Sequence, residues 1–207
     1  MSVAGQIEKI MEHARKRFAG WLDRYHPWHS DNHITERNLS FQFAQSFLSE
    51  LKDGMVFLEA PVTNGGDRTD NHLDTYLHSQ TLDIVLECKN FWAKRHVEAV
   101  KTDIERISTK FTQLLERHCP PGQGTQPVHG MVLAECWRRD HAEWWKGEKF
   151  KEWPAREAEF PNGWTFGYLT IHTHKEGADG TLYWLYGYSV EPLNSAALTV
   201  AHCKTEP

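Results

Sequence analysis

The 207-residue chain contains few cysteines and no long apolar run. Its four cysteines form no CxxC pair, so a zinc ribbon or a thioredoxin-type motif is not expected, and the thiols are predicted to be reduced. No stretch approaches the roughly 18 consecutive apolar residues of a membrane span, and the first residues lack an apolar signal core. We therefore expect a cytoplasmic protein with no membrane partner.

The chain also lacks an excess of positive charge. Lys and Arg total 23 against 28 Asp and Glu, which gives a formal net charge of -5. A protein that coats nucleic acid by overall electrostatics is therefore disfavoured, and any contact with nucleic acid must use a local surface. The sequence has neither a glycine-rich phosphate loop nor a serine nucleophile elbow.

Hydrophobic periodicity predicts both helices and strands. Apolar residues recur at three- and four-residue intervals over 5–25, from Thr35 to about Leu51 and from Lys94 to His118, which is the pattern of amphipathic helices. β-rich runs bounded by turn residues predict six strands, at Met55–Val62, Leu73–Leu77, Leu82–Phe91, Val128–Trp137, Trp164–His174 and Thr181–Val190. Residues 138–161 are expected to form one helix and an irregular tail.

This order of elements predicts a single α/β (α+β) domain over residues 1–207. Its core, about residues 33–137, would be a mixed central sheet flanked by helices. An extra N-terminal helix precedes this core, and an extension over 138–207 ends in a hairpin. The run Val128–Trp137 is almost continuously apolar, which is typical of a strand buried on both faces.

Two charged residues interrupt the apolar strand Leu82–Phe91. Glu87 and Lys89 point to the same face of that strand, about 6–7 Å apart along the chain. Charges at the end of a buried strand are costly unless they are paired, bind a metal or open onto a cleft. A strand-end ion pair is the structural alternative to an active site.

Glu87-x-Lys89 ends a strand hairpin, follows a helix and a strand, and precedes a long helix and a buried strand. In this context it resembles the PD-(D/E)XK nuclease superfamily, whose restriction-endonuclease-like fold has the order α-β-β-β-α-β. The resemblance covers about Thr35 to Trp137. It implies an endonuclease that hydrolyses phosphodiester bonds of DNA with Mg²⁺ or Mn²⁺, acting alone, as a homodimer or within a larger protein complex.

The resemblance also implies roles for individual residues. Asp74, Glu87 and the backbone carbonyl of Cys88 would hold the metal, Lys89 would serve the attacking water, and Glu36 would be the acidic residue on the preceding helix. Such a set suits this reaction because oxygen ligands hold a hard cation, which offsets charge on the phosphate and activates water. Leu73 stands before Asp74, where the family's motif has proline.

The aspartate that joins Glu87 can be chosen from the geometry of the hairpin. Asp83 lies four residues away on the same strand, about 13 Å, so it cannot share one ion with Glu87. If the hairpin turns at Gln80-Thr81, paired residue numbers sum to 161, and Asp74 faces Glu87. A shift of one residue would turn Asp74 away and leave Asp70 or Asp67 as the partner.

The helix expected over 94–118 carries the cations that are candidates for phosphate contacts. These are Lys101, Arg106 and Lys110. A solvated helix face is the alternative interpretation of the same residues. Two other functions remain open at this stage: a non-catalytic nuclease-fold subunit that binds nucleic acid or a protein partner, and an unrelated α/β protein with a structural salt bridge.

Overall fold

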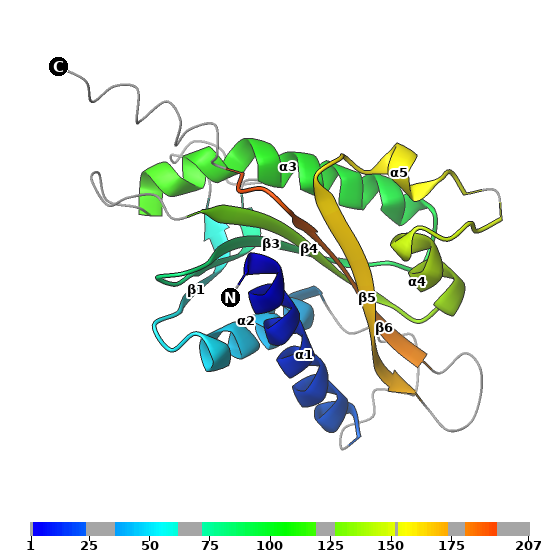
Figure 1. The fold of residues 1–207 in the computed structure, drawn as a ribbon, viewed down its shortest axis with the longest axis horizontal. Coiled ribbons are helices and arrows are strands. Elements are labelled where there is room, and N and C mark those ends of the chain that lie inside the picture. The colour runs from blue at the N-terminus through cyan, green and yellow to red at the C-terminus, as the bar shows by residue number, and fades with distance from the viewer. Residues whose placement is uncertain are drawn as a thin grey trace.

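A computed structural model describes residues 2–23, 36–61, 72–118, 127–151, 153–173 and 181–193. It is a mixed α/β fold in which helices lie on both faces of one sheet (Figure 1). The helices are α1 (Val3–Leu22), α2 (Glu36–Glu50), α3 (Arg95–His118), α4 (Arg139–Lys146) and α5 (Arg156–Glu159). The strands are β1 (Met55–Pro61), β2 (His72–His78), β3 (Asp83–Asn90), β4 (Val128–Cys136), β5 (Trp164–Thr173) and β6 (Thr181–Ser189).

The six strands form one mixed sheet in the order β1-β2-β3-β4-β6-β5. Neighbouring strands are antiparallel except β3 and β4, which are parallel. A parallel pair needs a crossover connection, and α3 supplies it across one face of the sheet. Because β6 pairs with β4, the C-terminal hairpin extends the same sheet that contains β1 to β3.

Alternate residues of β3 pack against different helices. Ile84, Leu86 and Cys88 belong to the hydrophobic cluster formed with α1 and α2. Val85 belongs to the other cluster, which includes the apolar side of α3. Since side chains alternate along a strand, Glu87 and Lys89 lie on the same face as Val85 and face α3.

Most predicted elements are confirmed with small shifts of their ends. All nine residues of β4 are buried, as the apolar run predicted. The segment expected to hold one helix contains two, because α5 forms a single turn after α4. Thr35 and Val62, the expected first residue of one helix and last residue of one strand, lie outside the described residues. No helix in the described part of the chain has both the length and the apolar content needed to cross a membrane.

Candidate active site

Two carboxylates meet where β2 begins and β3 ends. β2 and β3 pair with Thr75 opposite Leu86 and Tyr76 opposite Val85, so paired numbers sum to 161 and the predicted register is confirmed. Continued by one residue, this register brings Asp74 opposite Glu87. Asp74 accepts a hydrogen bond at Oδ2 from the backbone N–H of Cys88, at 2.7 Å, which fixes its carboxylate against β3.

Glu87 is the most deeply buried charged group of this cluster. Its side chain is 0% exposed, and neither carboxylate oxygen receives a well-aligned hydrogen bond from a described residue. Burial, and then the negative charge of Asp74, raise the pKa of Glu87 to about 9, although Arg106 opposes the shift. A carboxyl group in this setting has lost its hydration and gained only the contact with Arg106, which is an energetically costly arrangement.

Lys89 lies between two other carboxylates. Its Nζ is 3.1 Å from Oδ2 of Asp103 and 3.9 Å from Oε2 of Glu36. Burial disfavours the charged form of Lys89, but Asp103 and then Glu36 more than offset this effect and raise its pKa. Lys89 therefore carries a positive charge at neutral pH and is held at the end of β3.

Glu36 joins the first turn of α2 to the end of β3. Its Oε1 accepts a hydrogen bond from the backbone N–H of Asn90 at 3.1 Å, while Oε2 faces Lys89. Glu36 and Asn90 are far apart in the sequence, so this contact comes from the packing of α2 across the sheet. The structure thus brings Glu36, Asp74, Glu87 and Lys89 into one neighbourhood.

Sequence reasoning missed one member of this cluster, Asp103 on α3. Its side chain is 5% exposed and contacts both Lys89 and Arg106, with Arg106 Nη2 at 3.0 Å from Oδ1. Burial raises the pKa of Asp103, and the two cations oppose that shift. A sequence signal was present, because Asp103 falls within the apolar stripe that contains Val100 and Ile107.

Arg106 lies in the site, in contrast to the solvated helix face that was the alternative for this residue. Its Nη2 is 2.5 Å from Oε2 of Glu87 as well as close to Asp103. Lys101 is partly exposed on the same helix. The side chain of Lys110 lies outside the described part of the chain, so its predicted phosphate contact stays a prediction.

The other candidate aspartates are placed differently. Asp83 accepts hydrogen bonds from the hydroxyl of Tyr76, the backbone N–H of Ser79 and Nδ1 of His78, at 2.9, 3.2 and 2.8 Å. It therefore stabilises the turn of the hairpin, at the opposite end of β3 from Lys89. Asp70 and Asp67 lie outside the described residues.

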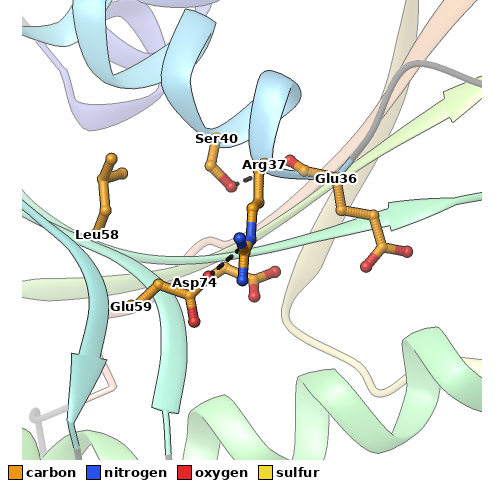
Figure 2. Close-up of a pocket in the computed structure, with 6 residues that line it drawn as sticks. All are labelled: Glu36, Arg37, Ser40, Leu58, Glu59 and Asp74. Atoms are coloured by element: carbon orange, nitrogen blue, oxygen red, sulfur yellow. Dashed lines mark hydrogen bonds and ion pairs between the residues drawn. The ribbon is translucent and has the colours of Figure 1, made fainter.

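A pocket of about 370 Å³ opens beside Asp74, between α2 and the strands β1 and β2 (Figure 2). It is lined by Glu36, Arg37, Ser40, Leu58, Glu59 and Asp74. Figure 2 shows Arg37 extending from α2 toward Glu59, and Arg37 Nε lies 3.3 Å from Glu59 Oε1. Asp74 and Glu36 can thus be reached from this pocket, whereas Glu87 is fully buried.

The predicted ligand set consists of oxygen atoms, the kind of ligand that a hard divalent cation prefers. Within the described residues no three His, Cys, Asp or Glu side chains are grouped to hold a metal ion. The predicted set instead combines two carboxylates, Asp74 and Glu87, with the backbone carbonyl of Cys88. The N–H of Cys88 points toward β2, and the carbonyl of a strand residue points to the same side as its N–H, so this oxygen is directed toward Asp74. A carboxyl group whose oxygens receive no well-aligned hydrogen bond from the described residues, as at Glu87, suits a metal ligand.

Comparison with known proteins adds no family assignment. The chain matches no protein-family model, no curated protein and no solved structure.

Proposed function

We propose that this protein is a metal-dependent endonuclease that hydrolyses phosphodiester bonds of DNA. The observation that carries the proposal is Glu87, a fully buried carboxyl group that lies beside Asp74, has an ion-pair contact with Arg106 and is followed two residues later by a charged lysine. Such a group is expensive for a fold to maintain for structural reasons alone. Strongly perturbed carboxyl groups that cluster with specific charges are typical of functional sites.

The arrangement of elements supports the same proposal. The segment from α2 to β4 has the order α-β-β-β-α-β, with three antiparallel strands and a fourth strand parallel to the third. This is the order of the restriction-endonuclease-like fold, which we propose for this part of the chain. Asp74 and Glu87-x-Lys89 then occupy the positions of that family's active-site motif.

Each residue has a definite role in the proposed reaction. Asp74, Glu87 and the Cys88 carbonyl would hold Mg²⁺ or Mn²⁺, which supplies a Lewis acid for the phosphate and lowers the pKa of a water molecule. The ammonium group of Lys89 would orient the attacking water and offset the negative charge that develops on the phosphate. Glu36 would keep Lys89 in place and line the pocket beside the metal ligands.

We propose that the protein acts on DNA in the cytoplasm. The described cysteines, Cys88 and Cys136, are buried free thiols, which suits a reducing compartment.

The test of this function is cleavage of plasmid DNA by the purified protein with Mg²⁺ or Mn²⁺. Lys89→Ala should lower the rate by about 10²–10³-fold, because it removes a charged group from the transition state. Lys146→Ala is the matched control, since Lys146 is an exposed lysine in the last turn of α4. Circular dichroism of both variants should match that of the unmodified protein. Cleavage that is absent in the unmodified protein, or unchanged by Lys89→Ala, would contradict the assignment.

One observation favours a second function, a non-catalytic nuclease-fold subunit that binds a protein or nucleic-acid partner. The sheet ends at β1, where Met55, Phe57 and Leu58 are 51%, 39% and 49% exposed. Exposed apolar groups on an edge strand are typical of interaction surfaces. This function predicts no metal-dependent cleavage, with oligomerisation or complex formation that is lost on replacing Phe57 by a charged residue.

A further inference from the structure

Arg106 contacts Glu87, the carboxyl group that the proposed function assigns to a metal. The guanidinium group extends from the middle of α3, and the side chain is 27% exposed. Its Nη2 atom lies 2.5 Å from Glu87 Oε2 and 3.0 Å from Asp103 Oδ1. A positive charge therefore already lies against the buried carboxyl group.

A divalent cation and this guanidinium would compete for Glu87. A ligand oxygen lies about 2.1 Å from Mg²⁺, so both cations at the same carboxylate would be within a few ångströms of each other. Two positive charges at such separations repel each other strongly in a poorly hydrated site. A cation bound at Glu87 would therefore weaken the contact between Arg106 and the same carboxyl group.

The contacts of the site show which group is able to move. Lys89 pairs with Asp103 and Glu36, and neither contact involves a proposed metal ligand. Arg106 has Asp103 as a second anchor three residues earlier on its own helix, so it can leave Glu87 without losing both carboxylates. An arginine side chain has a flexible stem and five N–H donors, which match the oxygens of a phosphate group.

Resting on the proposed function, we propose that Arg106 is a further phosphate-binding residue of this site, which covers Glu87 until a divalent cation binds there and then donates to the substrate phosphate. Asp103 is the positioning residue in this exchange, because it retains the helix-side contact with Arg106 and the contact with Lys89. Arg106 and Asp103 would thus be two residues of α3 in the site that the family motif defines on β2 and β3.

Metal affinity provides a test that does not depend on activity. Calorimetric titration with MnCl₂ should show binding to Arg106→Met about tenfold tighter than to the unmodified protein, since a like charge next to the ligand has been removed. Arg106→Lys keeps the charge and should bind Mn²⁺ with nearly the original affinity. Arg139→Met is the matched control, because Arg139 is an exposed arginine of α4 paired with Glu143. It should leave the affinity unchanged.

DNA cleavage should change in the opposite direction. Arg106→Met should cut DNA at least about 10²-fold more slowly at saturating Mn²⁺, because a charged donor to the phosphate is lost. Tighter metal binding combined with slower cleavage distinguishes this role from general damage to the site, which would weaken both. Tighter binding with undiminished cleavage would overturn the phosphate-binding role.

The remaining outcomes separate this inference from the function on which it rests. Absence of Mn²⁺ binding in both the unmodified protein and Arg106→Met would overturn the proposed function and this inference together. Binding in both with equal affinity would overturn the inference alone. If Arg106→Met does not fold, ¹⁵N NMR of arginine Nε–H groups replaces it, with the Arg106 signal assigned through Arg106→Lys. That signal should shift when the unmodified protein is saturated with Mg²⁺, and an unchanged signal would overturn the exchange.

Discussion

The two ends of β3 each carry a buried carboxyl group, but the hydrogen-bond partners of the two groups differ. At one end Asp83 accepts three hydrogen bonds, from a tyrosine, a histidine and a backbone N–H. At the other end Glu87 lies on the same face of the same strand but has only an ion-pair contact with Arg106 in place of well-aligned donors. Burial raises the pKa of both groups, but at Asp83 the neighbouring His78, Tyr76 and Ser79 all counteract it.

This difference distinguishes Asp83, a carboxyl group with a structural role, from Glu87, which has no comparable set of hydrogen bonds. The donors around Asp83 come from β2 and the turn, so their hydrogen bonds to Asp83 stabilise the hairpin. The surroundings of Glu87 supply a second carboxylate, Asp74, which adds negative charge where donors would be expected. We therefore expect neutral substitutions of Asp83 and Glu87 to change the free energy of unfolding in opposite directions.

The largest expected contrast is in the free energy of unfolding at neutral pH. Asp83→Asn should lower it by about 1–3 kcal/mol, because an amide cannot accept all three hydrogen bonds and leaves buried donors unpaired. Glu87→Gln should raise it by roughly 1–2 kcal/mol, because a neutral group of the same shape replaces a poorly solvated acid. Urea unfolding of both variants measures the two values. Equal destabilisation by both substitutions would remove the distinction between the two ends of β3.

A smaller effect is expected in the pH dependence of stability. The pKa of Glu87 rises from 4.5, the value for an unperturbed glutamate, to about 9 in the fold. Between these values only the unfolded chain releases the proton, so this residue makes the protein less stable as the pH rises, by at most about 1.4 kcal/mol per pH unit. The stability gained by Glu87→Gln should therefore grow between pH 5 and about pH 9. A difference between the two proteins that is constant over this range would contradict the burial of an ionisable Glu87.

The hairpin could be predicted from the sequence because its register depends on residues that are close together in the chain. The apolar alternation of residues 82–91 defines which side chains share a face, and the polar residues Gln80 and Thr81 locate the turn. Together they fix the register, which pairs Thr75 with Leu86 and, continued by one residue, brings Asp74 opposite Glu87. Lys89 follows from the same alternation.

Contacts between distant elements could not be obtained in this way. Periodicity identified the helix over 94–118, and Arg106 was predicted there as a phosphate contact, but the contact of Asp103 and Arg106 with the end of β3 was not predicted. A helical pattern does not tell which charged groups of another element will face the helix. Asp103 within the apolar stripe was the one available signal. The pairing of β6 with β4 could not be predicted either, because both strands are apolar enough to pair with several neighbours.

The most direct measurement of the central claim is Mn²⁺ binding by Asp74→Asn and Asp83→Asn, compared by calorimetry with the unmodified protein. Each variant removes one carboxylate from the hairpin formed by β2 and β3. Asp83 lies beside the turn of this hairpin, and Asp74 lies toward its other end. We predict that the unmodified protein binds Mn²⁺, that Asp83→Asn binds it with similar affinity, and that Asp74→Asn loses binding by about tenfold or more. Loss of binding in Asp83→Asn with retention in Asp74→Asn, or no binding by the unmodified protein, would contradict a metal site formed by Asp74 and Glu87.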